Sequence, residues 1–232
     1  MKFGIIVFPG TWSDRDCYYA LSDILGQKAE YIWHTETQIS DYDCIVLPGG
    51  FSYGDYLRPG AIARFSPVMA SVQEFALKGK PVIGICNGFQ ILCESGLLPG
   101  ILRQNDHLQY RCQWTYVMTE NISSSFTTLC QEEQLLKIPI SHYEGSYYAD
   151  EKTLAELEAK HRIIFRYTTA DGEVSSEANP NGALHNIAGI VNKSGNVLGM
   201  MPHPERACES LLGSSDGNLI WESIIASIQR NS

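Results

Sequence analysis

The sequence predicts one α/β domain over residues 1–232, in which helices flank a doubly wound, mostly parallel sheet and short antiparallel strands are added in the second half. Three observations predict this class. The first half alternates unbroken apolar runs with amphipathic stretches, a rhythm typical of strands that a parallel sheet buries on both faces. The second half has short β-branched or aromatic runs between polar turns. A chain of 232 residues also suits a single well-buried domain.

In the first half, the apolar run at 3–8 is the first expected strand and ends at Pro9-Gly10. A helix is expected from Ser13, a candidate N-cap, to Leu25, because Gly26 follows. Further strands are expected at 30–33, 44–47 and 81–85, and helices at 61–77 and 87–95. The proline at 81 stands at the first position of its strand, where a missing N–H is tolerated.

The second half is expected to add strands at 113–118, 136–140, 163–167, 187–191 and 197–201. The sequence Ser194-Gly195-Asn196 is typical of a hairpin turn before the last of these strands. A short surface helix is expected at 150–160 and an amphipathic helix at 218–228. Because no internal repeat, low-complexity tract or flexible linker interrupts the chain, we expect one compact domain.

Charge and hydropathy argue against two classes of partner. The formal net charge is −9, the pI is near 5.1, and the chain has no Lys/Arg-rich stripe. A nucleic-acid backbone would be repelled, so no nucleic-acid partner is expected. No apolar run reaches the length of a membrane span, and the run at 3–8 is too short for a signal peptide. We therefore expect a cytoplasmic protein with no membrane partner.

The seven cysteines give no sign of a disulfide framework or a metal site. They are odd in number and include no C-x-x-C pair, whereas disulfide and zinc frameworks have regular spacings. Mostly buried thiols in a reducing compartment fit this pattern better. Cys86 alone stands out from this background.

Cys86 lies in the sequence Gly84-Ile85-Cys86-Asn87-Gly88, where the strand at 81–85 gives way to a helix. This is the G-x-nucleophile-x-G pattern, with cysteine in place of serine. The glycines leave room for a sharp turn, and the first amides of the following helix favour a thiolate and an oxyanion. The motif alone equally suits a core cysteine between close-packed glycines, but its place at a strand-to-helix junction favours a nucleophile.

His203 and Glu205 are the expected base and its orienting carboxylate. Of the six histidines, only His203 lies in a segment whose backbone is restricted on both sides, by Pro202 and Pro204. In an extended, proline-stiffened segment, side chains two residues apart project to the same side, so Glu205 can bind one imidazole nitrogen while the other faces the thiol. Alone, His203 would more simply be a loop histidine bonded to the backbone. The position of Glu205 favours a Cys-His-Glu triad.

A glycine pair, Gly49-Gly50, follows the strand at 44–47, which a doubly wound sheet would place beside the nucleophile turn. Glycines leave a backbone N–H free to approach a substrate. We expect the N–H groups of Gly50 and Asn87 to form an oxyanion hole. Because a Gly-Gly pair alone is usually only a turn, this expectation depends on the triad.

Together these residues resemble the class-I (triad) glutamine amidotransferases, a family with a flavodoxin-like fold, and among them the members that serve purine biosynthesis. The triad motifs are shared by the whole family, whereas longer matched stretches are specific to those members. The matched stretches are 48–60 (PGGFSYGDYLRPG), 86–90 (CNGFQ), 179–182 (NPNG) and 199–206 (GMMPHPER).

The resemblance implies that Cys86 attacks the side-chain amide of L-glutamine, that His203 protonates the departing ammonia, and that a γ-glutamyl thioester is then hydrolysed. It also implies that Gln90 and the backbone near Gly50 hold the substrate. The ammonia would pass to a large synthetase subunit, which uses ATP and Mg to convert formylglycinamide ribonucleotide into its amidine. A small third subunit would complete the complex. This chain has no glycine motif that cradles phosphates, so no cofactor is expected in it.

One stretch departs from the family pattern. The segment at 142–145 (HYEG) matches a family segment that usually carries glycine at the position of Tyr143. His142 and Glu144 are candidates for lining the glutamine site, and a structural role in a loop is the alternative. A side chain at position 143 can alter substrate contacts or partner docking.

Two rival functions stay open from sequence alone. A γ-glutamyl hydrolase or a cysteine peptidase of related fold would use the same triad, but it would not need the tyrosine- and glycine-rich segment after Gly50. A non-catalytic binding subunit would have no physical need for all three triad residues. Loss of activity in Cys86→Ala, with partner binding retained, separates the enzyme from the scaffold.

Overall fold

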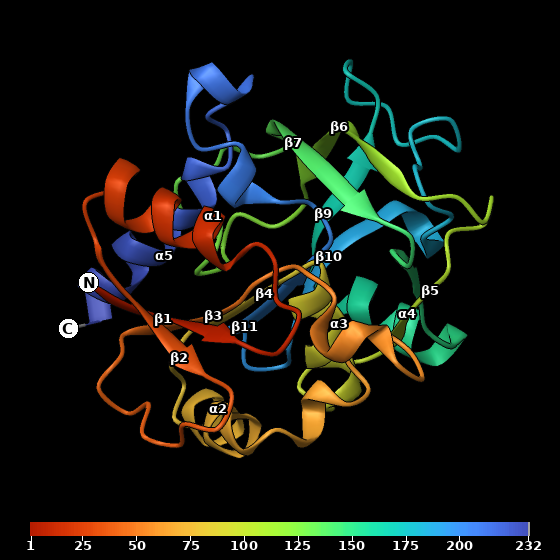
Figure 1. The fold of residues 1–232 in the computed structure, drawn as a ribbon. Coiled ribbons are helices and arrows are strands. Elements are labelled where there is room, and N and C mark those ends of the chain that lie inside the picture. Colours follow the sequence, from red (N-terminus) through yellow and green to blue (C-terminus); the bar gives the residue numbers. More distant parts are fainter. Residues whose placement is uncertain (232) are drawn as a thin grey trace.

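The computed structural model, which describes residues 1–231, confirms the predicted α/β class (Figure 1). The strands are β1 (Lys2–Val7), β2 (Lys28–Trp33), β3 (Cys44–Leu47), β4 (Val82–Ile85), β5 (Ile101–Arg103), β6 (Arg111–Thr119), β7 (Leu135–His142), β8 (Ser146–Tyr148), β9 (Ile163–Thr168), β10 (Ile187–Val191) and β11 (Val197–Met200). The helices are α1 (Asp14–Tyr19), α2 (Pro67–Leu77), α3 (Asn87–Glu94), α4 (Glu151–Ala159) and α5 (Asn218–Asn231).

The main sheet has nine strands in the order β2-β1-β3-β4-β11-β10-β9-β6-β7, and β5 pairs with β8 in a separate small sheet. The strands from β2 to β11 pair in parallel, in the 2-1-3-4-5 order of flavodoxin-like sheets. From β11 to β7, every neighbour is antiparallel. The change of direction occurs at β10 and β11, because the short turn between them allows only antiparallel pairing.

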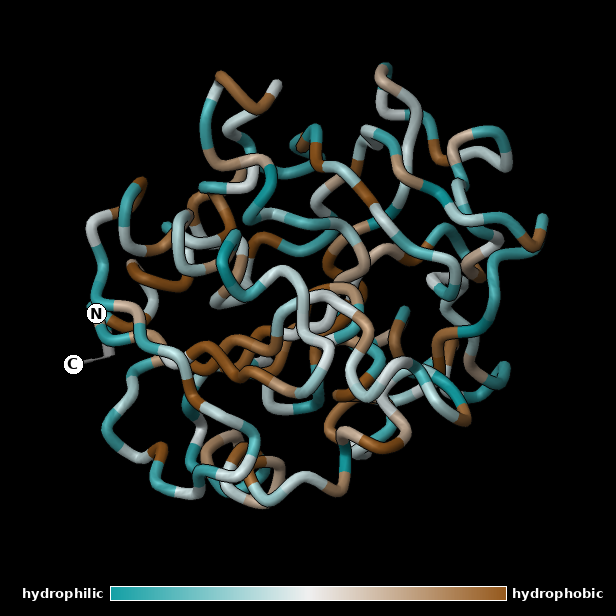
Figure 2. The backbone as a smooth tube through the Cα atoms, in the orientation of Figure 1, coloured by the Kyte–Doolittle hydropathy of each residue, from teal (hydrophilic) through white to brown (hydrophobic). Residues whose placement is uncertain are grey.

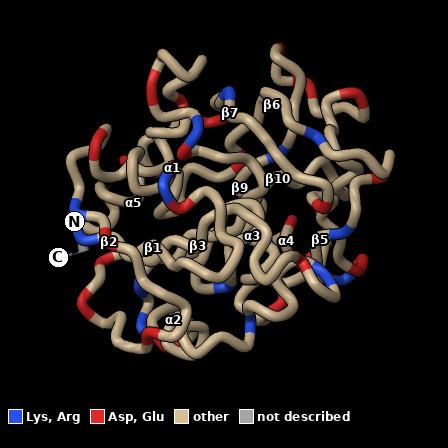
Figure 3. Tube along the Cα trace, in the orientation of Figure 1, with Lys and Arg blue, Asp and Glu red and all other residues tan. Residues whose placement is uncertain are grey.

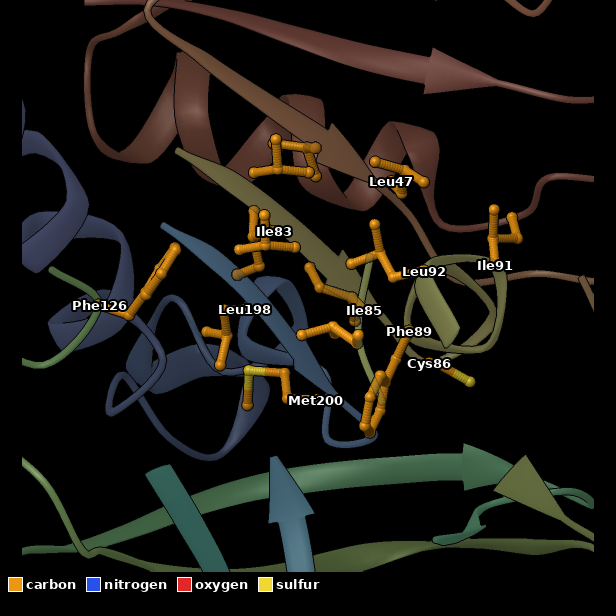
Figure 4. Close-up of a cluster of buried hydrophobic side chains, with 14 of the residues drawn as sticks. Leu47, Ile83, Ile85, Cys86, Phe89, Ile91, Leu92, Phe126, Leu198 and Met200 are labelled. Carbon is orange, nitrogen blue, oxygen red and sulfur yellow. The ribbon is translucent and has the colours of Figure 1, made fainter. Parts of the chain in front are cut away.

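The parallel strands form the centre of the hydrophobic core. Every residue of β3, β4 and β11 is buried, as expected for strands that are covered on both faces. α1 and α5 lie on one side of these strands and α2 lies on the other (Figure 1). Figure 2 shows the same strands as a hydrophobic band within the chain. Ile83, Ile85 and Met200 belong to one buried cluster with Phe89 of α3 (Figure 4).

Most charged residues lie in the outer parts of the fold. Figure 3 shows acidic and basic residues interspersed along the outer segments, while β3 and β4 carry none. Within residues 1–231, no helix is both long and apolar enough to cross a membrane.

Four elements differ from the sequence prediction. The helix expected at 61–77 is wrong in its first part, where a 3-10 turn covers Ala63–Phe65 and α2 begins only at Pro67. Ser66 has extended backbone angles because a proline ring disfavours the α region for the residue before it. The helix expected at 13–25 is α1 followed by a π-helical stretch, Ala20–Ile24. The strands β5 and β8 were not predicted, since three residues are too few to show a period.

Candidate active site

The candidate site lies at the carboxyl ends of three adjacent parallel strands. β3 leads into Gly49 and Gly50, β4 leads into Cys86, and β11 leads into the segment of His203. Residues that are far apart in sequence therefore meet at one edge of the sheet, where open α/β sheets place their ligands. Figure 4 shows Cys86 just beyond Ile85, with its sulfur directed away from the buried cluster.

Cys86 has a strained backbone, with φ 52° and ψ −106°. A residue other than glycine rarely adopts a positive φ, and such strain concentrates at functional sites. A Cβ on Gly84 would lie 2.7 Å from the carbonyl oxygen of Gly88, and a Cβ on Gly88 would collide with the carbonyl oxygen of Leu47. The two glycines of G-x-C-x-G are therefore a steric requirement of this turn.

His203 and Glu205 form a buried, hydrogen-bonded pair. Nδ1 of His203 lies 2.6 Å from Oε1 of Glu205, and the residues are 2% and 1% exposed. Burial alone would lower the pKa of His203, but the negative charges of Glu205 and Cys86 outweigh burial and raise this pKa to about 10. The ring is therefore protonated at neutral pH. Its Nε2 atom has no hydrogen-bond partner within residues 1–231.

Cys86 and His203 face each other across Gly49. A Cβ placed on Gly49 would lie 2.7 Å from Cε1 of the His203 ring and 3.4 Å from Cβ of Cys86. Both side chains therefore border the same small space. The thiol of Cys86 donates to the carbonyl oxygen of Ser141 at 3.6 Å. When this proton resides on Nε2 of His203 instead, as the raised pKa of the ring favours, the sulfur is the negatively charged partner of the ring.

Gly50 and Asn87 each offer an unused N–H beside Cys86. In the antiparallel bridge between Gly50 and Thr11, the flanking residues make the hydrogen bonds, so the N–H of Gly50 points away from the pair. Gly50 has φ 147°, and a Cβ there would lie 2.5 Å from the backbone nitrogen of Trp12. Asn87 is the first residue of α3, so its N–H has no acceptor within the helix. This geometry suits the oxyanion hole that the sequence predicts.

Gln90 has a structural task that the sequence did not reveal. Its Oε1 accepts from Nδ2 of Asn87 at 2.9 Å, and its Nε2 donates to the backbone oxygen of Glu144 at 2.6 Å. Oδ1 of Asn87 in turn accepts from the N–H of Ser52 at 3.1 Å. These bonds tie α3 to the segments that follow β3 and β7. Gln90 lines the pocket of Cys86, but both ends of its amide are engaged within the protein.

His142, Tyr143 and Glu144 follow one another along the wall of the same pocket. The ring of His142 is 3% exposed, and its Nε2 accepts from Nδ2 of Asn181 at 3.0 Å. Burial lowers the pKa of His142 to about 3, so the ring is neutral. The ring packs on Gly145, where a Cβ would find no room. Tyr143 has a negative φ, so its departure from the family pattern introduces no backbone strain.

Two small pockets flank the triad and share Gly50, Phe51 and Ser141. The pocket of Cys86 has a volume of about 50 Å³, and the other, on the His203 side, about 80 Å³. A cavity of about 470 Å³ lies beyond Glu205 and does not include Cys86. No group of three or more metal-ligand side chains occurs in the described part of the chain.

Three residues at the site were not anticipated: Asp55, Ser141 and Arg206. Asp55 lines the pocket of Cys86. Arg206 donates to Oδ2 of Asp16 at 3.0 Å and to Oγ of Ser13 at 2.8 Å, which holds the loop after β1 against the His203 segment. Asp55 and Arg206 stand in matched stretches, but one sequence does not show which members of a stretch face the site. Ser141 reaches the site through β7, whose pairing with β6 gives no local signal.

Sequence similarity identifies the class of protein. The sequence-family model of the CobB/CobQ-like glutamine amidotransferase domain matches residues 1–222. The chain therefore belongs to this family. It is a glutamine amidotransferase enzyme.

More specific relatives are subunits of one enzyme. The phosphoribosylformylglycinamidine synthase subunit PurQ of Moorella thermoacetica is 60% identical over 97% of this chain and 95% of the relative. The subunit of the same name from Methanosarcina barkeri is 50% identical over 100% of both chains. A chain in the structure of PurLQS from Thermotoga maritima is similar with a TM-score of 0.86 and 39% identity, over 97% of each chain.

Proposed function

We propose that this chain is the glutaminase subunit of a phosphoribosylformylglycinamidine synthase. It hydrolyses L-glutamine to glutamate and ammonia, and a synthetase subunit uses the ammonia in purine biosynthesis. The observation that carries the chemistry is the strained Cys86 opposite His203, whose Nδ1 is held 2.6 Å from Glu205. The identity of 60% and 50% to two PurQ subunits, over nearly the whole chain, supports the pathway.

In the resting site, the proton of the Cys86 thiol resides on Nε2 of His203, which the raised pKa of the ring favours. In the acylation step, the thiolate sulfur attacks the side-chain carbonyl carbon of glutamine. The N–H groups of Gly50 and Asn87 stabilise the oxyanion. His203 then gives the proton to the amide nitrogen, the C–N bond breaks, and ammonia leaves a γ-glutamyl thioester behind. Glu205 orients the ring and stabilises its protonated form, in keeping with the raised pKa of His203.

In the deacylation step, His203 takes a proton from a water molecule whose oxygen attacks the thioester carbonyl carbon. The same two N–H groups stabilise the second oxyanion. Collapse of this intermediate breaks the C–S bond, releases glutamate and leaves the thiolate of Cys86 beside protonated His203, as in the resting site. One glutamine and one water thus give one glutamate and one ammonia.

For the whole complex, we propose a large synthetase subunit and a small third subunit. The synthetase subunit holds ATP and Mg and converts formylglycinamide ribonucleotide into its amidine, while this chain holds no cofactor. Its similarity to a chain of the PurLQS structure supports a synthetase partner. We place the complex in the cytoplasm, because the seven free cysteines suit a reducing compartment.

The test measures glutamate release by the purified chain, with and without the two partner subunits, ATP and formylglycinamide ribonucleotide. Cys86→Ala removes the nucleophile, and Cys112→Ala is the matched control because Cys112 is an exposed thiol. We expect turnover to rise with the partners and to disappear in Cys86→Ala only. Amidine formation from ammonium chloride should persist in Cys86→Ala, because added ammonia bypasses the glutaminase site.

Two results would overturn this function. Turnover that does not depend on Cys86 would exclude the triad mechanism and favour a binding subunit. Full activity without partners, on γ-glutamyl peptides or proteins, would favour the γ-glutamyl hydrolase or peptidase alternative.

A further inference from the structure

Two carboxylates line the pocket of Cys86, and among the described residues no lysine or arginine lines it. Asp55 comes from the loop after β3 and Glu144 from the segment after β7, so the two halves of the sheet contribute one each. Oδ1 of Asp55 is buried and has no hydrogen-bond partner within residues 1–231. A buried acceptor without a partner is destabilising until a ligand supplies a donor.

His142 is a second and independent indication that a ligand completes this pocket. It lines the pocket, it is 3% exposed, and its Nδ1 has no partner in the described part of the chain. Oδ1 of Asn181 accepts from the N–H of Ala183, which turns Nδ2 of Asn181 toward Nε2 of His142. The neutral ring therefore carries its proton on Nδ1. The pocket wall thus holds an unused donor as well as an unused acceptor.

The side chain of Gln90 does not supply a hydrogen-bond partner for Asp55 or His142. Its amide oxygen accepts from Asn87 and its amide nitrogen donates to the backbone of Glu144. The carboxylate of Asp55 is therefore the acceptor in this wall that lacks a partner, while the carboxylate of Glu144 beside it is hydrogen-bonded with the side chain of Gln104. An α-amino acid head group complements this wall, since it carries one cationic donor and one anionic acceptor.

We propose that Asp55, together with Glu144, binds the α-ammonium group of glutamine and is a specificity-determining residue of the glutaminase site. This inference rests on the proposed function. An ammonium group has three N–H donors, and charge-assisted hydrogen bonds to carboxylates are strong. The Nδ1–H of His142 suits the α-carboxylate of the same head group. A glutamine within a peptide chain has no α-ammonium group, so this pair selects the free amino acid.

The two carboxylates of the pocket make the affinity for glutamine depend on pH. Burial and, second, the charge of Glu144 raise the pKa of Asp55 to about 6, and burial raises the pKa of Glu144. The other titratable groups of this pocket are Cys86, Tyr143 and the neutral His142. Below pH 6 Asp55 takes up a proton and loses its charge, so the affinity for an ammonium group falls.

The test compares glutamine with glutaramate, which is glutamine without the α-amino group, in the reconstituted synthase complex. The measured quantity is the ratio of kcat/KM for the two substrates. Asp55→Asn removes the charge and suits the backbone, since Asp55 has φ 55° and asparagine tolerates this region. We expect the ratio to fall about 10- to 100-fold through the KM for glutamine, the range for a lost hydrogen bond to a charged group.

The matched control is Asp171→Asn, at an exposed carboxylate outside the pocket, which should leave the ratio unchanged. A second variant, Glu144→Gln, keeps the backbone oxygen that binds Gln90 and should lower the ratio in the same direction. In the wild-type complex the ratio should fall below pH 6, and in Asp55→Asn this fall should be smaller, because only one of the two carboxylates remains. Amidine synthesis from ammonium chloride checks that each variant folds and docks.

The inference would be overturned if Asp55→Asn lowered kcat/KM equally for glutamine and glutaramate, or lowered neither. If Asp55→Asn does not fold, the result for Glu144→Gln decides. A wild-type complex that makes amidine from ammonium chloride but not from glutamine would contradict the proposed function instead, so the two failures are distinguishable.

Discussion

The two halves of the main sheet contribute to the site in different ways. The parallel half supplies the reacting atoms, because β3, β4 and β11 each end at a residue of the triad or of the oxyanion hole. The antiparallel half reaches the site mainly through the end of β7, where Ser141 to Glu144 form a wall. The chemistry is thus fixed by neighbouring strand ends, whereas the shape of the substrate pocket depends also on a strand at the far edge of the sheet.

This difference predicts which substitutions change kcat and which change KM or stability. Changes at the triad and oxyanion-hole residues, which follow the parallel strands, should lower kcat, because they move reacting groups. Changes in the segment after β7 should act on KM or on stability and should leave the chemical step nearly intact.

The largest effect is expected for Glu205→Gln. Without the carboxylate, the ring of His203 loses its orientation and the charge that raises its pKa, so kcat should fall about 10³- to 10⁴-fold. The raised pKa of wild-type His203 stabilises the fold below pH 6.5, and this contribution is lost as the pH rises toward 10. Urea unfolding across that range should show a smaller pH dependence in the variant. An unchanged kcat would exclude Glu205 as the orienting residue.

Gly49→Ala is expected to come next. The new Cβ would lie 2.7 Å from the His203 ring, so the ring must move away from Cys86. A misplacement of this order costs about 10²-fold in rate. Steady-state kinetics should show the loss in kcat, with little change in the KM for glutamine. A rise in KM with kcat unchanged would contradict the different roles of the two halves of the sheet.

Asp55→Asn should raise stability while it weakens substrate binding. The folded-state pKa of Asp55 is about 6, above the ordinary value of 3.8, so its contribution to stability is full below pH 3.8 and is lost as the pH rises through 6. Asparagine has no charge to bury, so the variant should be more stable by about 1 kcal/mol at pH 7, after allowance for solvent screening. Urea unfolding should show this difference at pH 7 and none at pH 3.5.

The smallest effect is expected for Tyr143→Gly, which restores the residue that the family usually carries. The kcat should change by less than about 3-fold, because the side chain lies in the wall and not at the reacting atoms. Stability should fall by about 1 kcal/mol, because glycine gains freedom in the unfolded chain and Tyr143 has no positive φ that would favour glycine. Thermal unfolding and glutaminase assays on the same preparation measure both effects. A large loss of kcat would show that the antiparallel half takes part in the chemistry.

The sequence predicted the parallel half well because its signals are local. Cys86 and His203 each stand in a short motif at the end of a buried strand, and the order of strands places these ends side by side. The position of Gly49 was predicted, but not its role as the space between thiol and imidazole, which only the packed structure shows.

The pocket wall was predicted less well because its contacts join distant segments. Gln90 resembles a substrate ligand in sequence, yet its amide is occupied by Asn87 and Glu144. Asp55 stands in a loop with no hydrophobic period, so no pattern distinguishes it from its exposed neighbours. The start of α2 was misplaced because tertiary context and Pro67 ended an otherwise helical pattern.

The left-handed backbone of Cys86 makes this enzyme vulnerable to one particular mutation. Glycine adopts φ 52° and ψ −106° without strain, and a single base change converts a cysteine codon to a glycine codon. Cys86→Gly should therefore be at least as stable as the wild type and should still bind the synthetase. It would release no ammonia, because the nucleophile is missing. In a cell that also carries the normal gene, such a chain would compete for the synthetase and act as a dominant inhibitor of it.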